Sequence, residues 1–279
     1  MKLYLLLFGS TFFLFACQNS QEEDHPLPEH KEDWAVFAQD DATAPRIVTV
    51  DLGWQEALPV EAFSQSLVIR VKAQEVLANG FPVGREVNLA DGLQDELIRA
   101  LEKPGLGIFT GSRTGAKEKA LVFYLRPLPA AERLARKIVQ DFTARPVEVH
   151  LKQDPSWQNY REELIPNGQE MNEIQNERIL HRLQESGDQL LAPRPVGHWA
   201  YFPDAARRQQ FLDTLLSAGF EIVALDTLKE GSKQPFGAHV ERVDSVHVPY
   251  VHHLTWGMAE LARRHGGAYD GWETILVRD

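Results

Sequence analysis

This sequence of 279 residues has only one cysteine, Cys17, so it cannot form an intramolecular disulfide and its folded parts must be held by packing. It is also poor in positive charge, since 29 Lys and Arg residues stand against 40 Asp and Glu residues and give a formal net charge of −11. That balance argues against a dominant phosphate-binding surface, and we expect no nucleic-acid partner. Beyond the first residues no apolar run is long enough to cross a membrane.

The start of the chain resembles a bacterial lipoprotein signal. Lys2 supplies a positive charge, residues 3–15 form an apolar run too short for a confident membrane span, and Leu14-Phe15-Ala16-Cys17 is similar to a lipobox. The resemblance implies that residues 1–16 are a signal peptide and that Cys17 carries diacylglycerol and an amide-linked chain such as palmitate. The alternative is an ordinary signal peptide or an uncleaved anchor in which Cys17 is coincidental.

Residues 17–32 are polar and acidic and contain two prolines, which predicts a flexible tether between the lipid and the folded part. Gln18 is not the aspartate associated with inner-membrane retention. We therefore expect a cell-envelope location, on the periplasmic leaflet of the outer membrane if the host is Gram-negative.

Composition after the tether is globular, with 43% apolar and 25% charged residues in the chain. Roughly 250 residues favour two domains. In residues 33–166, short β-rich runs and two helical repeats of apolar residues predict an α+β domain. We expect its strands at 34–37, 47–50, 67–71, 107–109, 120–124 and 147–149, and its helices around 87–101 and 131–138.

The segment Gly111-Ser-Arg-Thr-Gly-Ala-Lys117 superficially resembles a phosphate-binding loop. Its spacing is wrong and a strand follows it instead of a helix, so we expect a hairpin turn with Arg113 and Lys117 in solvent.

A stretch from Trp34 to Pro166 resembles an uncharacterised bacterial family, domain of unknown function 695, including its closing pattern Asp154-Pro-Ser-Trp-Gln-Asn-Tyr-Arg-Glu. The resemblance implies no activity. Trp157 and Tyr160 lie three residues apart, so we expect them to share one face of a helical turn and to pack against the end of the domain.

Residues 167–196 have a narrow apolar stripe on a polar segment and predict a helical connector. Residues 197–279 then show the order βαββαβ, which is typical of a ferredoxin-like antiparallel sheet with both helices on one face. Asp204 is the expected N-cap of the first helix, and glycines end both helices.

Two elements of this C-terminal domain, His198-Trp-Ala-Tyr-Phe202 and Tyr269-Asp-Gly-Trp272, resemble the regulator of ribonuclease E activity B family. Glu273 departs from the glycine of the enterobacterial prototype. The resemblance implies a small domain that binds protein and has no catalytic chemistry of its own. Its prototype is a cytosolic inhibitor of ribonuclease E, a role that an exported protein would not share.

Gly271 inside a strand predicts a bulge or a close backbone approach, with Tyr269 and Trp272 projecting to opposite faces. The candidate binding face is the open side of the sheet, and its candidate residues are Trp199, Tyr201, Tyr269, Asp270 and Trp272. An exposed aromatic patch there would indicate an interface, whereas we give slightly more weight to cover by the N-terminal domain.

Four histidines, His239, His247, His252 and His253, are close in sequence, but adjacent helical histidines diverge and the His-Glu-x-x-His pattern is absent. We expect no metal; if zinc were bound, His247, His252 and Glu241 would be the first candidates.

No Gly-x-Ser-x-Gly elbow and no reactive cysteine are present, so we expect neither catalysis nor a cofactor. The leading hypothesis is a lipid-anchored envelope protein that acts as a non-enzymatic protein-binding or regulatory module, with an unidentified protein partner and a membrane contact through Cys17. The alternatives are a cytosolic ribonuclease E-type regulator, if the signal is not used, and an envelope hydrolase with an unrecognised site.

Overall fold

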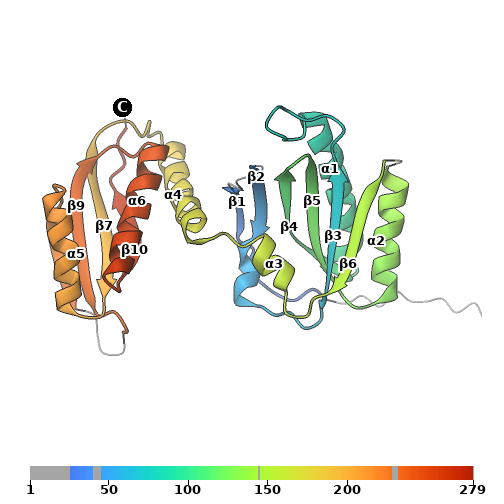
Figure 1. The fold of residues 1–279 in the computed structure, drawn as a ribbon, viewed down its shortest axis with the longest axis horizontal. Coiled ribbons are helices and arrows are strands. Elements are labelled where there is room, and N and C mark those ends of the chain that lie inside the picture. Colours follow the sequence, from blue (N-terminus) through green and yellow to red (C-terminus); the bar gives the residue numbers. More distant parts are fainter. Residues whose placement is uncertain (1–25, 40–44, 144, 228–231, 279) are drawn as a thin grey trace, which may run out of the picture.

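The computed structural model describes residues 26–39, 45–143, 145–227 and 232–278 and contains two antiparallel sheets (Figure 1). The predicted signal peptide, Cys17 and most of the predicted tether lie outside the described residues. None of the described helices is long and apolar enough to cross a membrane. The fold is α+β with two domains, as the sequence predicts.

The N-terminal domain is a six-stranded sheet in the order β1-β2-β4-β5-β3-β6. Its elements are β1 (Trp34–Gln39), β2 (Arg46–Asp51), the 3-10 helix η1 (Leu52–Glu56), β3 (Gln65–Lys72), α1 (Gly84–Glu102), β4 (Gly107–Gly115), β5 (Glu118–Leu125), α2 (Pro129–Phe142), β6 (Val147–Gln153) and α3 (Gln158–Glu163). All of its strand pairs are antiparallel, and β1 pairs directly with β2.

Both faces of this sheet are covered. Helices α1 and α2 bury one face through apolar residues of β3, β4 and β5, including Leu67, Phe109 and Phe123. The other face is covered by the segment from η1 to Phe63 and by α3, which bring Trp54 and Trp157 against β5. Such a double layer explains why β5 is a nearly continuous buried run instead of an alternating one.

Trp157 and Tyr160 have the packing role that their spacing predicts, because both are fully buried. The Trp157 ring stacks on Tyr124 with the centroids 4.0 Å apart. The Tyr160 hydroxyl donates to the carbonyl oxygen of Asp51 at 2.7 Å. These contacts seal the second face at the end of the domain.

The expected long turn at 111–117 is wrong in extent, because β4 runs on to Gly115 and β5 begins at Glu118. Ala116 and Lys117 alone form the turn, both with positive φ. The solvated arginine is also wrong, since the Arg113 side chain is 11% exposed and pairs with Glu163 of α3. The propensity of glycine for turns led to this error, because Gly111 and Gly115 instead lie where the neighbouring strand β2 approaches closely.

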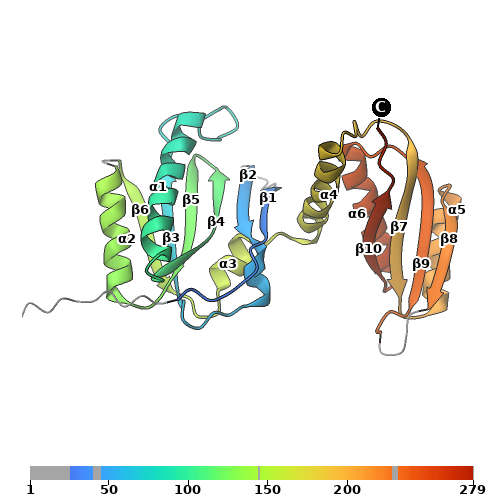
Figure 2. The same ribbon diagram turned by 180° about the vertical axis from the view of Figure 1, so that it is seen from behind.

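The predicted connector helix is α4 (Gly168–Glu185), which begins with a capping box formed by Asn167 and Glu170. It lies between the two sheets (Figures 1 and 2). Ile174, in its first half, belongs to the apolar cluster of the N-terminal domain, and Leu180, in its second half, to a cluster of the C-terminal domain. Arg178 of α4 also pairs with Asp33, with 2.6 Å between Nη2 and Oδ1.

The C-terminal domain has the predicted βαββαβ order and a four-stranded antiparallel sheet in the order β10-β7-β9-β8. Asp204 caps the first helix by accepting from the backbone N–H of Arg207 at 2.8 Å, as predicted. Both helices pack on the same face of the sheet, around Phe202, Phe211 and Met258. The elements are β7 (Arg194–Phe202), α5 (Ala205–Ser217), β8 (Glu221–Thr227), β9 (Phe236–Asp244), α6 (Val248–Arg264) and β10 (Ala268–Thr274).

Candidate binding surfaces

The last strand, β10, contains a bulge that changes which residues face the helices. Tyr269 lies opposite Ala200 and Trp272 lies opposite His198, while the register shifts between Tyr269 and Gly271. Ala200 and His198 are two apart on β7 and share one face. Tyr269 and Trp272 therefore both point to the helix side, and the prediction that they project to opposite faces is wrong because one extra residue resets the alternation.

Trp272 holds the connector helix to the domain. Its indole Nε1 donates to Asn176 Oδ1 of α4 at 2.7 Å, and the Asn176 amide donates to Thr255 Oγ1 of α6 at 2.8 Å. The Thr255 hydroxyl is also 2.8 Å from Asn172 Oδ1. Because the four side chains are buried, this network joins β10, α4 and α6 in the domain interior.

Tyr269 makes a second buried polar contact, with its hydroxyl 2.8 Å from His198 Nδ1. His198 is 2% exposed, and burial lowers its pKa to about 4, so the imidazole is neutral near pH 7. Burial likewise raises the pKa of Tyr269 well above its ordinary value. Two of the five candidate residues, Tyr269 and Trp272, thus support the interior.

The remaining three candidates lie at the surface. Trp199 and Tyr201 are half-buried and alternate with inward-facing Ala200 on β7, so they project from the face opposite the helices. Trp199 stacks on His239 of β9, with the ring centroids 3.9 Å apart. Asp270, in the bulge, is exposed.

No helix of the described residues covers this face, and the N-terminal domain stands beside α4 and not over the sheet (Figure 2). The cover that we expected from the N-terminal domain is therefore wrong. The reason is α4, whose two halves pack against different domains and hold them side by side.

The edge strand β8 adds apolar surface that the sequence analysis did not single out. Ile222, Val223 and Leu225 are 40%, 52% and 47% exposed, respectively, and β8 pairs only with β9 among the described residues. Leu216 of the adjacent α5 is 45% exposed. An edge with apolar side chains and free backbone groups is suited to pairing with another chain.

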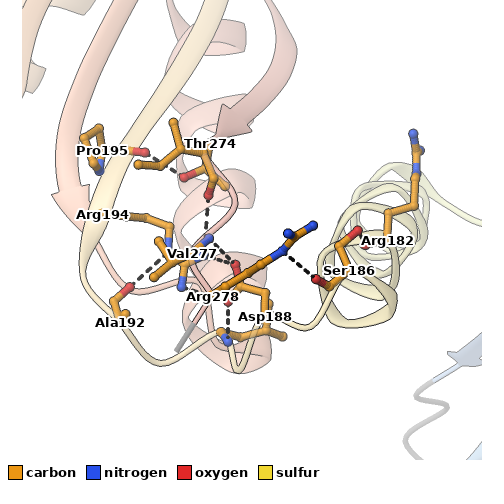
Figure 3. A network of polar contacts seen from close by, with 11 residues as sticks. Arg182, Ser186, Asp188, Ala192, Arg194, Pro195, Thr274, Val277 and Arg278 are labelled. Carbon is orange, nitrogen blue, oxygen red and sulfur yellow. Dashed lines mark hydrogen bonds and ion pairs between the residues drawn. The ribbon is translucent and has the colours of Figure 1, made fainter.

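A buried ion pair lies at the start of β7. Arg194 at the start of β7 faces Asp188, with 2.9 Å between Nη2 and Oδ1, and both side chains are at most 1% exposed (Figure 3). Asp188 also accepts from the backbone N–H groups of Leu190 at 2.7 Å and Val277 at 3.0 Å. The Arg194 guanidinium is the main cause that lowers the pKa of Asp188 to about 2. Sequence reasoning missed this pair because one acid and one arginine six residues apart carry no pattern.

The histidines do not converge. His247 caps α6, His252 faces Glu177 of α4 at 3.4 Å, and His239 lies on the open sheet face. Among the described residues, no group of three or more His, Cys, Asp and Glu side chains is placed to hold a metal ion.

A further site, in the N-terminal domain, was not anticipated. A cavity of about 660 Å³ opens between the segment before β1, the beginning of η1 and the C-terminal end of α1. His30 stacks on Trp54 in its wall, and its Nε2 lies 2.6 Å from Asp51 Oδ2. Its residues are scattered over positions 27–109, and three of its five ionisable residues, Glu29, His30 and Glu32, lie in the segment that composition assigned to the tether.

Comparison with known families supports both resemblances drawn from the sequence. Residues 173–274 match the family described as regulator of ribonuclease activity B, and residues 32–165 match a family of unknown function, DUF695. No curated protein matches the chain. A solved structure of an unknown protein from Galdieria sulphuraria aligns with 76% of this chain and 99% of its own at 11% identity and a TM-score of 0.22, which is too low to carry an argument.

Proposed function

We propose that this chain is a non-enzymatic regulatory module whose C-terminal domain binds another protein through the open face of its sheet. The observation that carries the proposal is the uncovered face itself, on which Trp199 and Tyr201 lie on β7, an inner strand of the described sheet. The family matched by residues 173–274 is named for regulation of a ribonuclease, which supports binding as the mode of action.

Aromatic residues suit this role because they bring large contact areas with few rotatable bonds. Trp199 is also held in place before any partner arrives, since it stacks on His239 and lies in a regular strand pairing. A preorganised side chain loses little conformational entropy on binding. The exposed Ile222 and Leu225 of β8 lie opposite Val240 and Ala238, so they belong to the helix side of the sheet and not to this surface.

The interior contacts explain why the other motif residues are present. Trp272 and Tyr269 bond to Asn176 and His198, so in this proposal they shape the domain and do not touch the partner. Substituting them would weaken binding through unfolding, whereas substituting Trp199 or Tyr201 would weaken it directly.

Site-specific photo-crosslinking in cells tests the proposal. A benzoylphenylalanine at position 201 is expected to capture one protein reproducibly, and Trp199→Ala in the same chain should abolish that capture. The matched control is the same crosslinker at position 142, because Phe142 is 37% exposed on α2 of the N-terminal domain. Equal capture from positions 201 and 142, or capture unaffected by Trp199→Ala in a folded chain, would reject this surface.

We further propose that the module is anchored to the cell envelope by lipid on Cys17, as the lipobox resemblance implies. Labelling cells with a lipid-alkyne precursor should mark the chain in the membrane fraction, and Cys17→Ser should remove the label. An unlabelled cytosolic chain would contradict the anchor. It would instead favour the alternative of a cytosolic regulator, for which inhibition of purified ribonuclease E by the full chain is the direct assay.

A further inference from the structure

The cavity of the N-terminal domain has an unusual chemical lining. Three aromatic rings contribute to its wall, from Trp34, Trp54 and Phe109. Four carboxylates do so as well, from Glu29, Glu32, Asp51 and Glu102, whereas no lysine or arginine does so among the described residues. Its volume of about 660 Å³ is in the range of small-molecule sites.

In one part of the cavity, a nitrogen base of the protein itself, the imidazole of His30, lies between an indole and a carboxylate. The His30 ring lies 3.5 Å from the Trp54 ring at an interplanar angle of 20°, and His30 Nε2 contacts Asp51 Oδ2 at 2.6 Å. Asp51 is oriented by the backbone N–H groups of Asp33 at 2.9 Å and Gly53 at 3.0 Å. This first subsite therefore combines an indole face with a fixed carboxylate.

The neighbouring part has an indole and carboxylates but no imidazole between them. Glu102 accepts from the backbone N–H of Phe109 at 2.9 Å, which orients its carboxylate. Trp34 stacks with Phe109, with the centroids 5.8 Å apart, and its Nε1 lies 3.3 Å from Glu32 Oε2. This second subsite places the Trp34 indole beside the carboxylates of Glu32 and Glu102.

The surroundings of Glu102 favour a positively charged ligand in the second subsite. Burial is the main cause that raises the pKa of Glu102, and the charges of Glu32 and Asp51 raise it further, against a lowering by the Phe109 N–H and by His30. Desolvated carboxylates that repel one another are stabilised by a cation.

We propose that this cavity binds an organic cation with a hydrocarbon body, a protonated amine or a guanidinium, whose charge lies against Glu102 and Glu32 and whose body lies against Trp34. Carboxylates supply charge-assisted hydrogen bonds, and the indole face attracts the cation. The apolar part of the lining, including Ile98 and Ile108, suits an aliphatic stem. The ligand is either a free amine or the lysine or arginine side chain of a polypeptide, since both carry the same chemistry.

The test uses the full chain and a pair of probes that differ in charge alone. Butylguanidinium carries the cation, and butylurea has nearly the same shape without it. Isothermal titration should show binding of butylguanidinium and none of butylurea at the same millimolar concentration. A short peptide with a central arginine, compared with its citrulline counterpart, distinguishes the sources: tighter binding of the arginine peptide than of butylguanidinium indicates a polypeptide, and the reverse indicates a free amine.

Glu102→Gln removes the charge and keeps an oxygen that can accept from Phe109, so it should weaken binding of butylguanidinium by about tenfold or more. The matched control is Glu96→Gln on the same helix, where the carboxylate pairs with Arg99 at 2.9 Å and does not line the cavity. Glu32→Gln, at an exposed residue, should weaken binding too, and it serves if Glu102→Gln does not fold.

Three outcomes would overturn the assignment. These are equal affinity for butylguanidinium and butylurea, no binding of either cation probe by the folded chain, and equal affinities in the Glu96→Gln variant and the folded carboxylate variants. Because the cavity lies in the N-terminal domain, none of these results depends on the partner surface of the C-terminal sheet.

Discussion

The two sheets of this protein differ in what covers their second face. In the N-terminal domain, α1 and α2 cover one face, and η1, α3 and the segment to Phe63 cover the other with apolar residues. In the C-terminal domain, α5 and α6 cover one face, and the opposite face of the described sheet carries Trp199 and Tyr201 at the surface. A sheet with one uncovered face buries less apolar surface, so its domain needs other stabilising contacts.

The C-terminal domain uses two sets of buried polar contacts. Trp272 bonds to Asn176 at one place, and Arg194 pairs with Asp188 at another, each joining strands to the segment before β7. Polar contacts of this kind are directional, so they specify one arrangement where an apolar layer would tolerate several. In this protein, the covered sheet is stabilised mainly by packed apolar side chains, and the sheet with one uncovered face relies more on directional polar contacts.

The largest expected effect comes from removing the second-face tryptophan of the covered sheet. Trp157→Ala should lower the free energy of unfolding by about 4 kcal/mol, because it leaves a cavity beside Tyr124 in a fully buried site. Its counterpart on the bare face, Trp199→Ala, should cost about 1 kcal/mol or less, since it loses mainly the contact with His239. Urea denaturation of both variants measures the difference. Similar losses in the two variants would break the comparison.

A smaller effect is expected from the ion pair. Arg194→Met should destabilise the C-terminal domain by about 3 kcal/mol, because it leaves the Asp188 carboxylate buried without its cation. The loss is measured by hydrogen exchange of amides in β7 and β9. Adding Asp188→Asn should recover part of it, because the double variant buries no charge; a double variant as unstable as the sum of the single ones would show that the pair does not act as a unit.

The smallest effect is a pH dependence of the same domain. The pKa of His198 is about 4 in the folded protein and 6.5 in an unfolded chain, so between these values the unfolded state binds more protons. Stability conferred by the neutral imidazole is therefore present above pH 6.5 and is lost as the pH falls toward 4. Between pH 7 and pH 5 the loss should be about 2 kcal/mol.

His198→Gln keeps a polar partner for the Tyr269 hydroxyl and cannot take up a proton in this range. Denaturation curves of this variant should lose the corresponding slope with pH. A wild-type curve that is already flat, or a slope that persists in His198→Gln, would show that another group titrates.

Much of the fold could be predicted because it is encoded locally. The apolar spacing of α1 and of both C-terminal helices, the Asp204 cap and the glycines after the helices are each properties of a few adjacent residues. The turn at Ala116 was misjudged for the same reason. Glycine spacing is a local signal, whereas the positions of Gly111 and Gly115 are set by approach of β2 from elsewhere in the chain.

The candidate sites were predictable only in part. Alternation correctly places Trp199 and Tyr201 on one face, but the placement of Trp272 depends on how many residues the bulge holds, which composition does not reveal. The N-terminal cavity joins His30, Asp51 and Glu102, which meet only when β1, η1 and α1 have folded together. Contacts between residues so far apart in the chain leave no periodic trace in one sequence.

The bulge at Asp270 shifts the alternation of side chains along β10 by one residue. Side chains before and after the bulge therefore follow different alternations, and Tyr269 and Trp272 both face the helices although they are three residues apart. If β10 kept regular pairing through Asp270, without the bulge, Trp272 would turn away from Asn176. Trp272 is thus connected to the interior not only by its own chemistry but also by the bulge that accommodates Asp270.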